Sequence, residues 1–306
     1  MNFRHAKTLL LGAIALGFLA SLGADKINPY WLFIFYDIGI SIVMAVSLNL
    51  INGYTGQFSL GHAGFMAVGA YTSAVITNQF GDLSFFAANG IFAGALLAGG
   101  LAAALAGLLV GIPTLRLRGD YLAIVTLGFG EIIRVILQNM DSVGAASGLK
   151  DIPHQTTFFW TWAFAAITVF VVTSIVNSTY GRGFIAVHDD EIAASSVGIN
   201  PVRYKVTAFV FGAFFAGIAG GLYAHHKQFL SPTGFDFLKS IDIVMMVILG
   251  GMGRTAGVIV AAVLLTLLPE FLRGFAEYRM ILYALLIIVL MIVRPQGLFA
   301  FRRQRN

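Results

Sequence analysis

The ionisable residues that fall inside long apolar runs of this sequence are few, and chemistry would first be sought there. Glu131 and Arg134 stand three positions apart, so on a helix they share one face and could neutralise each other's charge. Alternatively, Glu131 faces a polar route through the protein, from a helix that also carries the small residues Gly128 and Gly130. The sequence leaves both interpretations open.

The histidines offer a second kind of chemistry, metal binding or proton transfer. His62 follows a glycine-rich stretch, where a hydrogen-bonded packing residue and a ligand or proton relay are both conceivable, and we favour packing. His225 and His226 are adjacent, and neighbouring residues on a helix point about 100° apart. A metal site is therefore not expected there.

Motifs for nucleotide binding and hydrolysis are missing from the sequence. It has no Gly-x-x-x-x-Gly-Lys-Ser/Thr loop for phosphates, no His-Glu-x-x-His and no Gly-x-Ser-x-Gly. It also has no cysteine, which excludes disulfides, thiolate metal sites and thiol redox chemistry. We therefore expect a non-catalytic chain that binds no cofactor itself, and any ATP and Mg²⁺ that drive it must bind to other chains.

The elements that position these residues must lie in a lipid bilayer. The chain is 58% hydrophobic and only 11% charged, and its mean hydropathy is +0.86. Such a chain cannot hide its apolar surface around one aqueous core. Its 35 glycines allow close approach of transmembrane helices. The excess of basic residues falls in the connections between apolar runs, so nucleic acid is not an expected partner.

The hydrophobic runs predict an all-α integral membrane protein, a polytopic helical bundle of one domain over residues 1–306. About ten segments are long enough, given a hydrocarbon thickness of roughly 30 Å. They lie near residues 6–24, 30–51, 62–80, 84–111, 121–140, 157–177, 205–226, 240–253, 256–272 and 279–293.

Lysine and arginine set the orientation of the bundle. With both termini in the cytoplasm, basic residues favour the cytoplasmic connections by about two to one, as the positive-inside rule requires. The segment 6–24 also has features of a secretory signal peptide, because Arg4 and Lys7 precede an apolar run. Leu22 fits poorly at the third position before a cut after Ala24, so we expect this segment to be retained as a span.

Two hydrophobic stretches are interrupted by glycine, one in each half of the chain, at 52–64 and 250–257. This pattern is typical of discontinuous helices at corresponding places in an internally repeated transporter. Irregular backbone at membrane depth is tolerated only where it is buried in protein or lines a cavity. The alternative for both stretches is an ordinary turn between full spans, which Arg254 favours for the second.

One polar region, residues 178–205, interrupts the apolar pattern. Asp189, Asp190 and Glu191 stand where acids favour the positive end of a helix, and Gly198 and Pro201 are expected to end that helix. The prediction is a short cytoplasmic helix lying parallel to the membrane, with small alanines on one side. It could sit in a groove on a partner and move as a rigid body, or be a solvated loop helix without a partner.

The residues of this helix also carry a family resemblance. Glu191-x-Ala193-Ala194-x-x-x-Gly198 resembles the coupling-loop motif of bacterial ABC importer permeases. More narrowly, the chain resembles branched-chain amino acid permeases of the LivH/LivM type, and LivM more than LivH. The blocks that carry this resemblance are residues 47–71, 118–134, 247–257 and 294–299. Ala145 and Ala146 stand where a glycine pair is expected, so the outer loop departs from the pattern.

The resemblance implies an assembly in the bacterial plasma (inner) membrane. Its partners would be a second related permease, two cytoplasmic ABC ATPases and an extracytoplasmic solute-binding protein. The solutes would be branched-chain or other amino acids, or urea and short amides as in close relatives. The glycine interruptions would also suit a secondary transporter or facilitator. A third possibility is an intramembrane enzyme or scaffold, but the paired catalytic groups that an enzyme needs are not visible in the sequence.

The resemblance and the residue patterns together give two sets of candidate residues. A solute carboxylate could meet backbone N–H groups at the start of the helix after Gly61. The coupling residues are Asp190, Glu191, Ala193, Ala194, Gly198 and Asn200. The candidate pathway residues are Gln57, Ser59, Gly61, His62, Gly64, Thr126 and Glu131.

Overall fold

The structure is a computed structural model that describes residues 28–80, 85–114, 119–275 and 278–293, with five single positions before residue 28. Most of the expected segment 6–24 and the block 294–299 lie outside the described residues.

Within these residues the chain is helical and has no strand, which confirms the all-α prediction. Its only β-type pairing there is one isolated bridge between Leu149 and Leu230. The α-helices are α2 (Pro29–Asn49), α3 (His62–Asn78), α4 (Phe85–Thr114), α5 (Asp120–Gln138), α6 (Phe158–Val176), α7 (Thr179–Asp189), α8 (Glu191–Ser196), α9 (Pro201–Lys227), α10 (Phe237–Gly250), α11 (Thr255–Phe271) and α12 (Arg279–Val293). The shorter elements are a π-helix, η2 (Leu50–Tyr54), and the 3₁₀ turns η3 (Asp141–Val143), η4 (Ala145–Ser147), η5 (Pro232–Phe235) and η6 (Leu272–Phe275).

The expected apolar segments from 30–51 onward each coincide with one of these helices. Among the described residues, 6 helices could cross a membrane by length and composition: Pro29–Tyr54, Phe86–Pro113, Tyr121–Gln138, Phe158–Val176, Pro201–Lys227 and Thr255–Gly274. The chain is therefore a multi-pass membrane protein. Helices α3 and α10 have 17 and 14 residues. At about 1.5 Å per residue they are shorter than a hydrocarbon core of about 30 Å.

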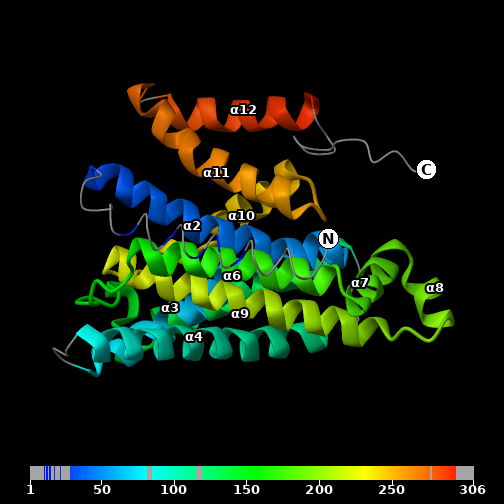
Figure 1. The fold of residues 1–306 in the computed structure, drawn as a ribbon, viewed down its shortest axis with the longest axis horizontal. Coiled ribbons are helices and arrows are strands. Elements are labelled where there is room, and N and C mark those ends of the chain that lie inside the picture. Colours follow the sequence, from blue (N-terminus) through cyan, green and yellow to red (C-terminus); the bar gives the residue numbers. More distant parts are fainter. Residues whose placement is uncertain are drawn as a thin grey trace.

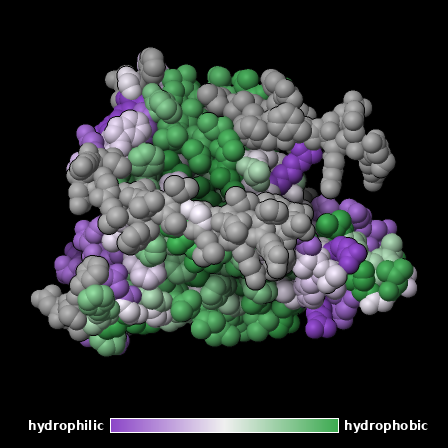
Figure 2. Space-filling view, viewed as in Figure 1, coloured by the Kyte–Doolittle hydropathy of each residue, from purple (hydrophilic) through white to green (hydrophobic). Residues whose placement is uncertain are grey.

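The outer surface of the bundle suits lipid. On α4, Leu101, Leu105 and Leu109 are 60–71% exposed and recur every four residues, so they form one outward face. Figure 2 shows hydrophobic residues over the middle of the molecule and hydrophilic residues toward its two ends. This distribution matches a bilayer around the middle of the bundle and water at each end.

Glycines let the central helices touch backbone to backbone. A Cβ added at Gly69 of α3 would lie 2.2 Å from the Cα of Gly217 on α9. A Cβ at Gly99 of α4 would lie 2.7 Å from the carbonyl oxygen of Gly69. Helices α3, α4 and α9 therefore form a tight group, as small residues permit in membranes.

The bundle has two distinct ends (Figure 1). We call the end that carries α7 and α8 the α8 end, and the opposite end, where α9 finishes at Lys227, the Lys227 end. Helices α2 and α9 run antiparallel, because Asp37 near the start of α2 pairs with Lys227 at 2.9 Å. Ile51 near the other end of α2 lies against Gly212, where an added Cβ would be 2.5 Å from the Ile51 side chain.

The first glycine interruption is a true break. After η2 the chain turns back into the protein as an irregular segment, residues 55–61, before α3 begins at His62. Thr55, Gln57 and Ser59 are at most 3% exposed, so these residues are buried in protein, whereas Gly56 between them is exposed. The prediction of a discontinuous helix is correct at this position.

The second interruption, at residues 250–257, is not the counterpart of the first. It is a tight turn between α10 and α11. The counterpart of residues 55–61 is the segment 228–236, which joins the long helix α9 to the short helix α10. The prediction therefore paired the wrong stretches. The structural repeat is a long helix, an irregular segment and a short helix, and its two copies start from opposite ends of the bundle.

Candidate substrate pathway and coupling surface

The two short helices meet at their first turns. The N–H of Ala63 on α3 donates to Ser240 Oγ on α10 at 3.1 Å. Helix α3 then runs toward the Lys227 end, where Thr77 bonds His225 at 2.8 Å. Helix α10 runs toward the α8 end, where the following turn places Gly253 beside Gly53. Two helix N-termini, each with a positive dipole end, therefore converge inside the protein.

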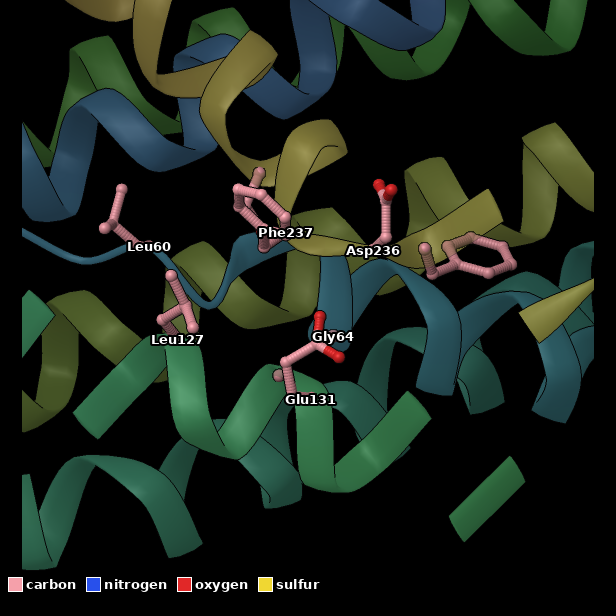
Figure 3. Close-up of a pocket in the computed structure, with 9 residues that line it drawn as sticks. Leu60, Gly64, Leu127, Glu131, Asp236 and Phe237 are labelled. Atoms are coloured by element: carbon pink, nitrogen blue, oxygen red, sulfur yellow. The ribbon is translucent and has the colours of Figure 1, made fainter. Parts of the chain in front are cut away.

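A small pocket lies beside this junction, between α3, α5 and the start of α10 (Figure 3). Its empty volume is about 170 Å³, and in this conformation it is a narrow depression without room for a solute. Its walls are mainly leucine, phenylalanine and glycine, with two carboxylates. The lining residues are Leu60, Gly64, Leu127, Gly130, Glu131, Phe235, Asp236, Phe237 and Ser240.

Glu131 satisfies both interpretations drawn from the sequence. Its carboxylate accepts from Arg134 Nε at 2.7 Å, so the expected ion pair forms. The same residue lines the pocket, and Figure 3 shows its carboxyl oxygens beside Gly64. The side chains of Glu131 and Arg134 are 30% and 24% exposed, so the pair is only partly covered. Asp236 is held differently, because its Oδ1 caps α10 by accepting from Lys239 N at 3.0 Å.

Three backbone donors around the start of α3 have partners inside the protein. Thr126 Oγ1 accepts from Leu60 N at 3.0 Å, and the carbonyl of Gly61 accepts from Gly64 N at 3.1 Å. With Ala63 bonded to Ser240, this terminus offers less to a solute carboxylate than the sequence suggested. Thr126 thus anchors the irregular segment to α5.

Gly61 and Gly64 allow α3 to begin against α5. A Cβ at Gly61 would lie 2.3 Å from the Thr126 carbonyl oxygen, and a Cβ at Gly64 would lie 2.8 Å from the Cα of Gly130. Both positions therefore require glycine for close packing, and Gly64 also forms part of the pocket wall.

His62 is fully buried and hydrogen-bonded. Its Nε2 lies 2.8 Å from Ser47 Oγ on α2. Ser59, nearby in sequence, exchanges two bonds with the side chain of Asn52, at 3.1 and 3.3 Å, through its backbone N–H and carbonyl. Gln57 lies two residues before Ser59, and its Nε2 donates to Thr55 Oγ1 at 2.8 Å. Gln57 and Ser59 on the irregular segment, and His62 at the start of α3, are therefore not among the residues that line the pocket.

The polar region folds as two helices, where the sequence predicted one. Helix α7 ends at Asp189, and Asp190 then caps α8 by accepting from Ile192 N and Ala193 N at 2.8 and 3.0 Å. Helix α8 has six residues and is followed by Gly198 at φ +84°, a conformation that favours glycine.

Pro201 begins α9, so the prediction that it ends the short helix before it is wrong. It occupies the first turn of α9, where its missing N–H is harmless. Asn200 is the N-cap of that helix, because its Oδ1 accepts from Arg203 N at 3.3 Å.

Helix α8 presents an apolar ridge at a polar end of the molecule. Ile192 and Val197 are 67% and 75% exposed, and Ala193 is exposed beside them, whereas Ala194 is buried. Glu191 is turned inward, and its carboxylate pairs with Lys205 Nζ at 2.8 Å. We refer to Ile192, Ala193 and Val197 as the α8 ridge. An exposed apolar surface of this kind usually marks a contact with another protein or a membrane.

Residues 30–293 match the family described as branched-chain amino acid transport system / permease component. The chain belongs to this family. It is similar to the high-affinity branched-chain amino acid transport system permease proteins LivM of Escherichia coli and Salmonella typhimurium, each 37% identical over 96% of this chain and 74% of the relative. The probable LivM protein of Methanocaldococcus jannaschii is 23% identical over 85% of this chain and 90% of its own length. No solved structure matches the chain.

Several residues of this permease were not anticipated from the sequence. Asp236, Phe237 and Ser240 line the pocket opposite Glu131, although more than a hundred residues separate them from Glu131 along the chain. An available signal was the acid Asp236 directly before a segment that forms a helix of only 14 residues, too short to span a bilayer. Lys205 was seen only as a basic residue of a connection, and its pairing with Glu191 was not foreseen.

Proposed function

We propose that the chain is the permease subunit of an ABC importer that moves branched-chain or other amino acids across the bacterial plasma membrane. Its α8 end would face the cytoplasm, together with both termini. The family supports transport of this class of solute, and the LivM relatives are named as permeases of branched-chain amino acids. ATP and Mg²⁺ would bind to two separate ATPase chains, and an extracytoplasmic protein would deliver the solute.

The observation that carries the ABC assignment is the α8 ridge. Ile192 and Val197 project from a short helix whose start is fixed by the Asp190 cap and the Glu191–Lys205 pair. A rigid apolar ridge that is exposed at the water-facing end fits a groove on a partner. Movement of that partner would then be passed to α9, to which α8 is directly joined.

The pocket beside Glu131 is the proposed solute site. Leu60, Leu127 and Phe237 suit an aliphatic side chain, and the Glu131 carboxylate suits an ammonium group. The pocket must widen before a solute can enter, so the site is formed by the transport movement and weak binding is sufficient. Selection would then lie mainly with the external binding protein.

The proposed second permease chain would cover α5. Tyr121, Ile124 and Ile132 are 53–72% exposed on this helix, and the partly exposed Glu131–Arg134 pair lies beside them. Charged groups facing lipid at this depth are costly, so a protein surface or an aqueous path should face them. The solute path would accordingly run along α5, between the two permease chains.

The test of the proposal is purification of the complex from native membrane, followed by uptake in proteoliposomes. We expect ATPase chains in the purified complex and uptake that requires ATP. Gly198→Glu and Glu191→Lys should abolish uptake although both variants still fold, the second with reduced stability. Asn177→Glu, a charge added at an exposed position at the end of α6, is the matched control and should transport normally. Uptake by this chain alone, driven by a proton or sodium gradient, would contradict the proposal.

The solute class can be tested at Glu131. Replacing it with glutamine removes the charge that attracts ammonium, so leucine uptake should fall about tenfold, the effect of losing one charged hydrogen bond. The double variant Glu131→Gln, Arg134→Gln controls for the unpaired guanidinium and should be equally slow. Urea carries no charge, so uptake that is unchanged in both variants would favour a neutral amide as the cargo.

A further inference from the structure

The irregular segment 55–61 touches the cytoplasmic helices of the proposed importer at one end. Gly56 lies against the ring of His188 near the end of α7, and a Cβ at Gly56 would be 2.4 Å from His188 Nδ1. One residue further on, Gln57 Nε2 donates to the backbone carbonyl of Lys205 at 3.4 Å. The segment is thus in contact with both helices that flank α8.

Helices α7, α8 and the start of α9 are joined as one body. Glu191 of α8 pairs with Lys205 of α9. Tyr204 of α9 packs on Gly183 of α7, where an added Cβ would be 2.2 Å from the tyrosine ring. The rings of Tyr180 and Tyr204 are 4.5 Å apart. A force applied to the α8 ridge would therefore move this body together with His188.

At its other end the same segment reaches the pocket. Leu60, which lines the pocket, is bonded through its N–H to Thr126 on α5. Two residues after Gly61, Ala63 is bonded to Ser240 on α10. A displacement of the segment would therefore reach both walls of the pocket within a few residues.

The segment is suited to move as a unit. It belongs to no helix or strand, and its own folding is maintained by the two bonds between Asn52 and Ser59 and by Gln57 N donating to the Ile51 carbonyl at 3.1 Å. The π-helix η2 precedes it, and single π turns are frequent at functional sites.

We propose that the segment 55–61 is the link that transmits movement of α7 and α8 to the solute pocket, and that His188 is the residue through which the link is driven. This inference rests on the proposed function, because it assumes an ATPase acting on the α8 ridge. His188 is a positioning residue in this scheme, since it touches Gly56 and does not line the pocket.

The first test uses His188→Ala in the purified transporter complex in proteoliposomes. Loss of the ring breaks the contact with Gly56, so solute transported per ATP hydrolysed should fall about tenfold, within the range of coupling changes seen along such networks. His188→Phe keeps a ring at this position and should restore most of the coupling. His154→Ala is the matched control, an exposed histidine outside the α7–α9 body, and should leave the ratio unchanged.

A second pair of variants addresses the other side of the contact. Gly56→Ala places a methyl group into the His188 ring at a position with φ +67°. Gly119→Ala also places a side chain at a positive φ, +57°, but with no atom within 4 Å of the new methyl group. Only Gly56→Ala should reduce transport per ATP. Equal loss in Gly119→Ala would show backbone strain alone and would overturn the inference.

A conformational readout separates transmission from simple instability. The chain has no cysteine, so Leu127→Cys introduces its single thiol, in the pocket wall. ATP should change the labelling rate of this thiol by a small-molecule maleimide, and the change should be lost in the His188→Ala background. If labelling still responds fully to ATP and transport stays coupled, the inference is wrong. If the unsubstituted complex shows no ATP-dependent uptake at all, the proposed function fails first.

Discussion

The side-chain carbonyl of Asn49 accepts a hydrogen bond from the backbone N–H of Gly253, at 2.9 Å. The bond ties the end of α2 to the turn between α10 and α11, across 204 positions of sequence. Gly53 makes the approach possible, because a Cβ there would lie 2.2 Å from Gly253 N. Tyr54 and Thr255 add a bond of 2.8 Å between their hydroxyls. The two glycine-rich stretches found in the sequence therefore form one joint in the fold.

Substitution of Asn49 should weaken this joint. Asn49→Leu keeps the approximate volume but leaves the partly buried Gly253 N–H without its acceptor. We expect a loss of roughly 1–3 kcal/mol in the free energy of unfolding, measured by denaturant titration in detergent micelles. Asn177→Leu is the control, because Asn177 is exposed and bonds only within its own helix. An equal loss in both variants would show that the joint has no special role.

Glycine should be required at Gly69 and dispensable at Gly128. A methyl group at Gly69 would meet the backbone of Gly217 at 2.2 Å, and backbone cannot move aside cheaply. Gly69→Ala should therefore lower the free energy of unfolding by about 1–3 kcal/mol. Gly128 has no atom within 4 Å of an added Cβ, so Gly128→Ala should be neutral or slightly stabilising in the isolated chain.

Gly128 also allows a test of the proposed contact between two permease chains. If a second permease chain packs on α5 as proposed, a bulky residue at Gly128 should prevent co-purification of the partner although the isolated chain stays folded. Gly128→Trp tests this by size-exclusion chromatography of the complex. Normal assembly of that variant would argue against α5 as the face between chains.

The spans could be predicted because apolar runs of sufficient length have few alternatives in a bilayer. Helix α7 was missed for the opposite reason. Arg182, His188 and two glycines make it polar and short, and its start depends on Ser178 Oγ accepting from Gly181 N at 3.2 Å. Local signals of that strength occur in many loops.

The sequence did not predict how deeply an irregular segment is buried in the protein. Residues 228–236 include proline, glycine and serine, which describes an outer loop as well as a segment returning into the protein. Their placement depends on distant contacts, such as Tyr71 Oη donating to the Leu230 carbonyl at 3.4 Å. For the same reason the pairing of Glu131 with Arg134 could be foreseen from spacing, whereas Asp236 across the pocket could not.

Reversal of the Glu191–Lys205 pair should separate folding from coupling. The two side chains are 27% and 10% exposed, so Glu191→Lys places a second cation beside a nearly buried one. We expect a loss of about 1–3 kcal/mol in the free energy of unfolding, between the values for surface and buried pairs. Adding Lys205→Glu restores opposite charges and should recover most of that loss.

Uptake measurements on the same variants show whether Glu191 only fixes α8 on α9 or also contacts the ATPase. If Glu191 serves only to fix α8 on α9, the charge-swapped double variant should also recover ATP-driven uptake. If stability returns and uptake does not, Glu191 has a further contact with the ATPase. Failure to recover stability would mean that the pair does not form.

The hydrogen bonds of His62 predict that it is a packing residue and not a proton relay. Ser47 Oγ donates its proton to the Met44 carbonyl at 2.9 Å, so it must accept from His62 Nε2–H at 2.8 Å. This arrangement places a proton on His62 Nε2. Glutamine can place an N–H donor at the same reach, so His62→Gln should fold normally and keep ATP-driven uptake. His62→Ala should lose roughly 1–3 kcal/mol of unfolding free energy, because it leaves Ser47 without its donor.

A secondary transporter that used His62 to carry protons would instead lose all uptake in His62→Gln while remaining folded. Measurement of uptake and of thermal unfolding on His62→Gln therefore decides between the two mechanisms.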